Sequence, residues 1–245
     1  MNSRRGALAA AFFSSLLLGA CASAPGRPLP GDIPPTPSEV SDFSVLYSQN
    51  CAGCHGSQGK GGAALALADP VYLAIANDSV IRNAAANGIS GTSMPAFAQS
   101  AGGMLTEKQI DAIVGGIRTN WSKPNALQGV AAPPYAASTP GDSARGGQAY
   151  VQFCSSCHGA AGRGGAKASS IVDSSFLALL NDQELRTLVI VGRPELGAPD
   201  WRNNVPGHAM SPQEISDVVA WLAAQRTKFP GQPFPSPTNA TGEIR

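Results

Sequence analysis

The sequence CAGCHGSQGKGGA, residues 51–63, decides the fold because the chain contains this pattern twice. The second copy, CSSCHGAAGRGGA, occupies residues 154–166 and is identical at eight of the 13 positions. Further matches follow downstream in the same order in both halves of the chain. They are Asp69, Leu73, Asn77, Asp78, Arg82 and Gly88 in the first half and Asp173, Leu177, Asn181, Asp182, Arg186 and Gly192 in the second. We therefore interpret the chain as a tandem duplication of one unit.

Each copy opens with a C-x-x-C-H motif, which is the attachment signature of c-type haem. Two thiols three residues apart on one helical turn can add to the two vinyl groups of a porphyrin, and the adjacent histidine then falls below the iron. We expect two covalently bound haem c groups, one in each copy. The expected haem-binding residues are Cys51, Cys54 and His55 in the first copy and Cys154, Cys157 and His158 in the second.

A zinc site is the alternative for a set of four cysteines and two histidines. The motif occurs in two separate copies, and each copy continues into a glycine-rich loop. Of the five cysteines, only Cys21 lies outside the two motifs, and we expect that cysteine to carry a lipid, so this exported chain has no spare cysteine. These features favour haem.

The first 20 residues have the pattern of a secretory signal peptide, with Arg4 and Arg5 ahead of an apolar stretch. This stretch is shorter than the roughly 20 apolar residues that span a bilayer. The sequence LGAC, residues 18–21, resembles a bacterial lipobox, so we expect Cys21 to become the lipidated N-terminus. The alternative is an ordinary signal peptide followed by an incidental cysteine. With the lipid, the protein is expected on the periplasmic side of a bacterial membrane.

The charge balance gives no indication of a nucleic-acid partner. The whole chain has 17 basic and 16 acidic residues. Removal of residues 1–20 takes away Arg4 and Arg5, which leaves 15 basic against 16 acidic residues. We therefore expect no nucleic acid among the partners.

Proline-rich stretches divide the rest of the chain. Residues 21–40 are expected to form a tether, residues 124–140 a linker and residues 229–245 a tail. Residues 41–123 and 141–228 are expected to form two domains. Apolar residues recur there at helical spacing and no segment alternates with period two, so the predicted fold class is all-α. The predicted helix N-caps are Ser41, Asn77, Thr106, Asn181 and Ser211.

With these motifs in this order, each unit resembles a class I c-type cytochrome domain. The shared order is an N-terminal helix, C-x-x-C-H, a middle helix, a methionine loop and a final helix. The resemblance covers residues 41–123 and 141–228 and implies two tandem all-α cytochrome c domains. It also implies that the final helix crosses the first one, and that a loop methionine is the sixth iron ligand. The tandem arrangement resembles two-haem periplasmic electron carriers and the cytochrome subunits of respiratory or photosynthetic complexes.

In the first unit, the sequence GTSMP at residues 91–95 matches the Met-Pro loop of that family. The resemblance therefore implies Met94 as the sixth ligand of the first haem. Met104 is the other methionine of this unit. It directly precedes the final helix, which favours a role in loop or core packing.

The second unit departs from the family pattern. Ala198 stands where a ligand like Met94 is expected. Two substitutes follow in the same loop, His208 and Met210. Met210 aligns with the apolar Leu105 of the first unit, whereas His208 lies in the loop that must supply the ligand. Both residues remain candidate iron ligands, and an open iron site is the third interpretation.

Trp201 and Arg202 lie in that loop as well. One interpretation makes them a wall of the second haem, with Arg202 paired to a haem propionate through its forked donors. The other interpretation is a surface arginine beside a packed tryptophan.

The resemblance implies single-electron transfer rather than organic catalysis, because the haem supplies the redox chemistry and the protein positions it. We expect redox protein partners, in a membrane electron-transfer complex. The alternative is a haem enzyme, such as a peroxidase or a sulfur-compound oxidase, acting at an open second haem. A haem sensor or a structural subunit is a third interpretation.

Overall fold

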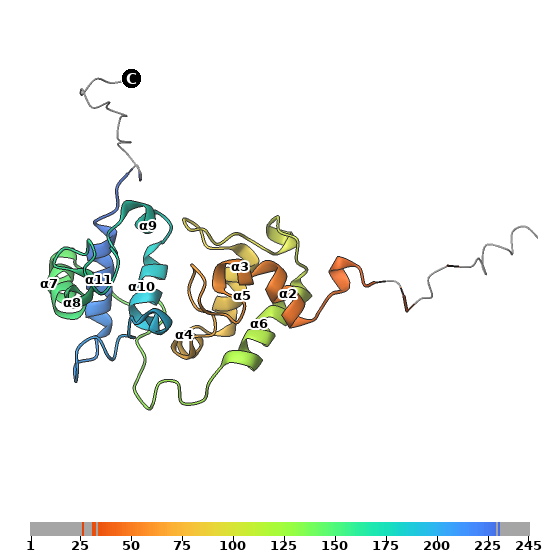
Figure 1. Ribbon diagram of the computed structural model, residues 1–245, viewed down its shortest axis with the longest axis horizontal. Coiled ribbons are helices and arrows are strands. Elements are labelled where there is room, and N and C mark those ends of the chain that lie inside the picture. Colours follow the sequence, from red (N-terminus) through yellow and green to blue (C-terminus); the bar gives the residue numbers. More distant parts are fainter. Residues whose placement is uncertain (1–25, 27–30, 33, 229, 231–245) are drawn as a thin grey trace, which may run out of the picture. The chain divides into compact units, whose positions relative to one another are not determined.

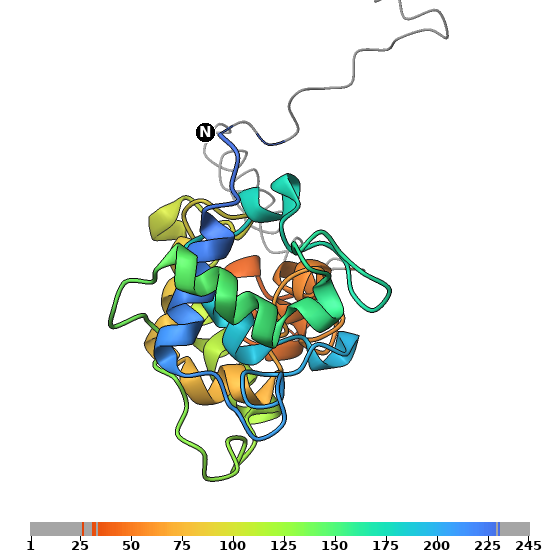
Figure 2. The same cartoon turned by 90° about the vertical axis from the view of Figure 1, so that its left-hand side faces the viewer.

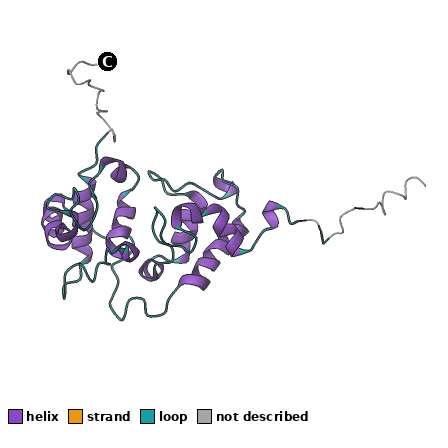
Figure 3. Ribbon diagram, viewed as in Figure 1, coloured by secondary structure: helices purple, strands orange, loops and turns teal. Residues whose placement is uncertain are grey.

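The computed structural model describes residues 26, 31–32, 34–228 and 230. Among these residues, helices are joined by loops and no β-strand is formed (Figure 3). The chain divides into two segments, residues 1–40 and 41–245. The helical element described in residues 1–40 is η2 (Pro37–Glu39), whose first turn is closed by a capping box from Thr36. The predicted signal peptide and Cys21 lie outside the described residues.

Residues 41–245 contain two repeats with the same order of helices (Figure 1). The first repeat has α2 (Phe43–Asn50), α3 (Ala52–His55), α4 (Pro70–Ile75), α5 (Asp78–Asn87), η3 (Gln99–Ala101) and α6 (Glu107–Trp121). The second has α7 (Ser143–Phe153), α8 (Ser155–His158), α9 (Ser174–Ala178), α10 (Asp182–Val191), η4 (Pro194–Leu196) and α11 (Pro212–Ala223). The predicted all-α class is confirmed. Within the described residues, no helix combines the length and the apolar character that crossing a membrane requires.

Polar side chains cap the helices at the predicted places, with one exception. The confirmed caps are Asn77, Thr106, Asn181 and Ser211. The prediction of Ser41 was wrong, because Asp42 caps α2 and its Oδ1 accepts the Val45 N–H at 3.0 Å. A carboxylate satisfies the free N–H groups and also suits the positive end of the helix dipole, so the helix begins one residue later than expected.

The first and last helices of the second repeat pack closely because a glycine lies at their crossing. Figure 2 shows α11 (blue) crossing α7 (green), and the two helices are in contact. A Cβ atom on Gly146 of α7 would lie 1.9 Å from the Asp217 carbonyl oxygen of α11. Any side chain at this position would therefore push the two helices apart.

The first repeat places its glycine on the other helix of the crossing. A Cβ atom on Gly116 of α6 would lie 2.1 Å from the Phe43 ring of α2. Counted from the helix caps, Gly116 corresponds to Trp221. Counted from the C-x-x-C-H motifs, Phe43 corresponds to Gly146. The large and the small residue have thus exchanged helices between the two repeats.

Each repeat nevertheless packs a tryptophan against the same tyrosine. Trp121 meets Tyr47 edge-on with ring centroids 4.9 Å apart, and Trp221 stacks on Tyr150 at 4.2 Å. Both indoles also touch a glycine of the loop that follows the C-x-x-C-H motif. These glycines are Gly59 and Gly162. The final helix is therefore fixed against the motif loop in both repeats.

Candidate haem sites

Each motif histidine is held in the tautomer that metal ligation requires. His55 Nδ1 lies 2.7 Å from the Leu65 carbonyl oxygen, and His158 Nδ1 lies 2.8 Å from the Ser169 carbonyl oxygen. A carbonyl oxygen can only accept a hydrogen bond, so Nδ1 carries the proton and Nε2 keeps a free lone pair. Burial lowers the pKa of His55, which favours the neutral ring that a metal ligand must have.

The two cysteines of each motif lie on one helical turn with their histidine. The His55 N–H donates to the Cys51 carbonyl at 3.0 Å, and His158 and Cys154 repeat this bond at 3.0 Å. Burial, with a smaller contribution from the neighbouring thiol, raises the pKa of Cys51 to about 11 and that of Cys154 to about 12. These surroundings disfavour a thiolate and suit a neutral thioether sulfur, which is the product of haem attachment.

No three His, Cys, Asp or Glu side chains in the described part of the chain are grouped so that they could hold a metal ion. The four motif thiols are also unpaired, with Cys51 buried and Cys54 exposed. Each repeat offers two free thiols for covalent attachment and one imidazole as an iron ligand, which fits covalent haem c.

A glycine turns the chain directly after each histidine. Gly56 has a φ of 82°, and a Cβ atom there would lie 1.9 Å from the Lys60 carbonyl oxygen. Gly159 repeats this conformation with a φ of 78°. The Tyr47 hydroxyl donates to the Gly56 carbonyl at 2.9 Å, and Tyr150 donates to Gly159 in the same way. The loops that hold the histidines are thereby tied to the first helix of each repeat.

The loop of Met94 is shaped by a glycine and two short polar contacts. Gly88 ends α5 with a φ of 69°, and a Cβ atom there would lie 2.7 Å from the Met94 carbonyl oxygen. The next residue, Ile89, donates its N–H to that carbonyl at 3.0 Å. Thr92 Oγ1 donates to the Ile89 carbonyl and accepts the Met94 N–H at 3.1 Å. The sequence reasoning did not single out Thr92, although it lies within the quoted Met-Pro loop.

The second repeat closes its loop with the same backbone bond around an alanine, although the residues in between form η4 there. Gly192 ends α10 with a φ of 69°, and a Cβ atom there would lie 2.2 Å from the Pro199 carbonyl oxygen. The next residue, Arg193, donates its N–H to the Ala198 carbonyl at 2.9 Å. This bond is the counterpart of the bond from Ile89 to Met94, so Ala198 occupies the place of Met94. The structure thus agrees with the alignment derived from the sequence.

Met210 lies in the core of the second repeat. It is 2% exposed, and its N–H donates to the Trp201 carbonyl at 2.9 Å. Leu105 makes the same type of bond to Phe97 in the first repeat, at 2.7 Å. The Met210 Sδ lies 3.9 Å from Asn204 Nδ2. Met210 therefore follows the path of Leu105 through the repeat, and its predicted role as iron ligand would require this contact to open.

His208 lies at the surface, with 48% of its side chain exposed. Its Nδ1 accepts from Gln152 Nε2 at 3.1 Å, and its Nε2 faces Glu214 Oε1 at 3.5 Å. Its ring packs edge-on against Phe153, with centroids 5.2 Å apart. Both ring nitrogens thus have partners in the protein, and ligation of iron by His208 would require one partner to be released.

Arg202 is occupied by protein groups. Its Nη2 lies 2.6 Å from Asp200 Oδ2, and its Nη1 donates to the Ala126 carbonyl of the linker at 3.3 Å. Its guanidinium carbon lies 4.9 Å from the centre of the Trp201 ring, and Trp201 is 2% exposed. Trp201 is thus packed and Arg202 is part of an ion pair, and their role beside the second haem stays a prediction.

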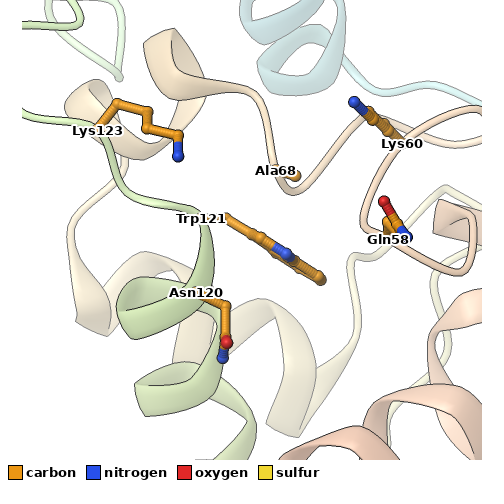
Figure 4. Close-up of a pocket in the computed structure, with 6 residues that line it drawn as sticks. All are labelled: Gln58, Lys60, Ala68, Asn120, Trp121 and Lys123. Carbon is orange, nitrogen blue, oxygen red and sulfur yellow. The ribbon is translucent and has the colours of Figure 1, made fainter.

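An open hollow lies beside the end of α6 in the first repeat. Figure 4 shows the indole of Trp121 extending between the side chains that line this hollow. The lining residues are Gln58, Lys60, Ala68, Asn120, Trp121 and Lys123. None of them is a predicted haem-binding residue, although Gln58 and Lys60 belong to the loop that follows the first C-x-x-C-H motif.

Two family models match the chain, one in each repeat. Residues 38–115 match the model described as cytochrome C oxidase, cbb3-type, subunit III, and residues 143–226 match the model described as cytochrome c. Together these matches cover more than half of the chain.

Curated relatives are respiratory subunits by name. A cytochrome bc1 complex cytochrome c subunit of Mycobacterium bovis is 26% identical over 188 residues, which cover 76% of this chain and 64% of the relative. A cbb3-type cytochrome c oxidase subunit CcoP of Azospirillum sp. is 31% identical over 129 residues, which cover 48% of this chain and 38% of the relative. The chain therefore spans less than two thirds of the length of either relative. Among solved structures, a reducing HAO-like protein complex of Kuenenia stuttgartiensis aligns with a TM-score of 0.43 at 17% identity, covering 79% of this chain and all of that one.

Proposed function

Because the chain belongs to the c-type cytochromes and carries two covalently bound haem c groups in tandem domains, we propose that it passes single electrons between membrane-associated redox partners. We place this activity on the periplasmic side of a bacterial membrane. We further propose that the protein acts as a subunit or docked carrier of a respiratory or photosynthetic complex. The names of the relatives, from bc1 and cbb3-type respiratory complexes, support the respiratory alternative.

The observation that carries this proposal is the pair of complete donor sets within one compact segment. Residues 41–245 form that segment, and each repeat contains two thiols and an oriented histidine. A bound haem c supplies one reversible electron at each site. The protein contributes orientation, through the carbonyl groups of Leu65 and Ser169, which fix the imidazoles of His55 and His158.

Met94 is our proposed sixth ligand of the first haem. Its loop is fixed by the contacts of Gly88, Ile89 and Thr92, and its side chain is only partly exposed. For the second haem, His208 and Met210 remain our two proposed protein ligands. Each must give up a contact to bind iron: His208 its bond to Gln152 or its approach to Glu214, and Met210 its contact with Asn204.

Purification of the native complex tests the proposed partners. A tagged chain would be solubilised from its own membranes in mild detergent and its companions identified by mass spectrometry. Subunits of a quinol-oxidising or oxygen-reducing complex are the expected companions, and they should reduce or oxidise the haems of this chain. Companions without any redox centre would contradict the proposal.

We also propose that lipid on Cys21 anchors the protein. This residue lies outside the described residues, and the proposal rests on the sequence LGAC at residues 18–21. Cys21→Ser, produced without partner proteins, should release a soluble protein with its full haem absorption. A variant that still sediments with the membranes would contradict the lipid anchor.

A haem enzyme acting at the second iron, for example a peroxidase or a sulfur-compound oxidase, is the second candidate. One observation favours it: Ala198, which has no ligand atom, occupies the place of Met94. Addition of carbon monoxide to the fully reduced protein distinguishes the two functions. A spectral change at one haem supports the enzyme, and an unchanged spectrum supports pure electron transfer.

A further inference from the structure

Both ends of α10 in the second repeat contact loops of the first repeat. At its start, Asn181 Nδ2 donates to the Ser90 carbonyl at 3.2 Å, and Ser90 belongs to the loop of Met94. Just beyond its end, Arg193 Nη2 donates to the Gly62 carbonyl at 2.9 Å. Arg193 Nη1 lies 3.4 Å from the next carbonyl, that of Ala63. One helix therefore reaches the loops on both sides of the predicted first haem.

The loop that Arg193 contacts is also the loop that orients His55, the predicted iron ligand of the first C-x-x-C-H motif. It runs from His55 through Gly62 and Ala63 to Leu65, whose carbonyl accepts the bond from His55 Nδ1. A shift of this loop would therefore move the acceptor that fixes the imidazole.

The contact is specific to the second repeat. By the matching backbone bonds to Ala198 and Met94, Arg193 corresponds to Ile89, which has no charged group. The side chain of Arg193 is 18% exposed, and its Nε pairs with Glu195 Oε1 at 2.6 Å. The loop that carries a predicted iron ligand in the first repeat is thus used in the second repeat to hold its neighbour.

Charges of this loop also surround a buried carboxylate of the first repeat. Asp69, which caps α4, is 8% exposed. Burial raises the pKa of Asp69, and the nearby carboxylates of Glu195 and Asp200 raise it further. Each of these two acids is paired with an arginine, Glu195 with Arg193 and Asp200 with Arg202. The two ion pairs therefore limit the electrostatic repulsion between Asp69 of the first repeat and the carboxylates of Glu195 and Asp200 in the second.

The linker between the repeats is held by arginines as well. Arg186 of α10 is 2% exposed and donates to the carbonyl groups of Pro134 at 2.9 Å and Tyr135 at 3.1 Å. Arg202 donates to the Ala126 carbonyl of the same linker. Hydrogen bonds donated by charged groups are among the stronger ones in proteins. The second repeat therefore holds both the linker and the first haem loop through its arginines.

We propose that Arg193 is a positioning residue that fixes the second domain on the haem loops of the first and thereby sets the rate of electron exchange between the two haems. Electron exchange between two centres falls steeply with their separation, so a loosened contact slows it. The guanidinium also lies between Glu195 and the first haem loop, so removal of its charge would leave Glu195 unpaired, disfavour the reduced haem and lower its potential. This inference rests on the proposed electron-transfer function.

Three variants of the holoprotein test it. Arg193→Gln removes the positive charge and the guanidinium group. Arg193→Lys keeps the charge but has no planar group that could contact the Gly62 and Ala63 carbonyls together. Arg82→Gln is the matched control, because Arg82 also pairs with acidic residues but does so within the first repeat. One electron is delivered by a photoreductant, and its equilibration between the haems is followed by absorbance. The potential of each haem is measured by spectroelectrochemical titration.

Arg193→Gln should slow exchange several-fold and lower the potential of the first haem. Arg193→Lys should retain that potential while exchange still slows, and Arg82→Gln should leave the exchange rate at its wild-type value. Wild-type exchange and potential in Arg193→Gln, with both haems attached, would overturn the inference. Wild-type protein whose haems do not exchange electrons at all would instead overturn the proposed function.

Discussion

The loops of Met94 and Ala198 are closed by the same backbone bond but differ in between, where the second loop forms η4 and has its left-handed glycine at Gly197 instead of Gly91. In both, a glycine ends the preceding helix, and the next N–H bonds to the carbonyl of the compared residue, at 3.0 Å in the first loop and 2.9 Å in the second. The second loop keeps this closure although alanine has nothing to offer a metal. The closure is therefore encoded by the helix-ending glycine and the backbone bond after it, independently of the ligand. A duplicated loop can then exchange one role, ligation, for another, contact with the neighbouring domain.

Met94→Ala should remove the side-chain difference between the two loops and have the largest effect. Loss of the thioether ligand removes the group that stabilises the reduced iron, so the first haem potential should fall by on the order of 0.2 V. The long-wavelength charge-transfer band of methionine-ligated ferric haem should disappear. Spectroelectrochemical titration measures the first effect and absorbance the second. An unchanged band would assign it to another methionine.

Ala198→Met is the reverse experiment and should make the second loop resemble the first. Because the Ala198 carbonyl accepts the same backbone bond as the Met94 carbonyl, we expect the new side chain to reach the second iron. We expect a second charge-transfer band and a rise of about 0.1 V in the second haem potential. Ala198→Leu, similar in size but without sulfur, is the control. A rise in both variants would show that filling space, rather than ligation, changes the potential.

Met210→Leu and His208→Gln separate the two predicted ligands of the second haem. Met210→Leu reproduces the residue of the first repeat, and as a volume-conserving change it should cost less than about 1.5 kcal/mol of stability. A shift of the second haem spectrum in this variant alone would identify Met210 as the ligand, and a shift in His208→Gln alone would identify His208. An unchanged spectrum in both variants would exclude both residues and leave an open iron.

A smaller effect is expected from a polar contact found at one helix crossing only. In the second repeat, Asp217 of α11 accepts from Arg145 Nε at 2.8 Å, from Gln213 and from the Asp142 N–H at 2.7 Å. In the first repeat, Ala112 occupies the corresponding position. Asp217→Asn should therefore destabilise the second domain by about 2 kcal/mol. Thermal unfolding measures this loss. The control is Glu107→Gln, which removes the exposed ion pair with Arg82 and should lower the free energy of unfolding by less than about 0.5 kcal/mol.

The same carboxylate predicts a pH dependence. Hydrogen bonds from Arg145 hold the pKa of Asp217 below its ordinary value of 3.8. The unfolded chain therefore takes up this proton at a higher pH than the folded chain. The stabilisation is complete above about pH 4 and is lost as the pH falls through the lower folded value. Asp217→Asn should remove this component of the acid sensitivity, and an identical acid profile in the variant would contradict it.

Local features of the sequence were sufficient to predict most of the fold. The repeated motif, the caps at Asn77 and Asn181 and the place of Ala198 depend on neighbours within a few residues, and the structure agrees with them. The error at Ser41 is also local, because Ser41 and Asp42 are both good caps and only the contact with Val45 decides between them. The site roles of the ligands stay predictions.

Contacts between distant residues were not predictable in this way. Arg193 meets Gly62 across 131 positions, and Arg202 meets Ala126 across 76. The acceptors are backbone carbonyls, which every residue has, so no residue type marks the partner. The one signal was the replacement of Ile89 in the first repeat by Arg193 in the second. A charged residue at a position that is apolar in the other repeat indicates that its surroundings differ, but it does not identify the residues that it contacts.

The exchange of Phe43 and Gly116 for Gly146 and Trp221 has a consequence for how the chain assembles. A chain with two similar units can pair the first helix of one with the last helix of the other, a common error of repeat proteins. Pairing α2 with α11 would force Phe43 against Trp221, and overpacking of this kind costs about 1–3 kcal/mol. Pairing α7 with α6 would place two glycines together and leave a void. Each helix thus fits its own partner and rejects the other, so the tandem protein discriminates against misassembly at a single crossing.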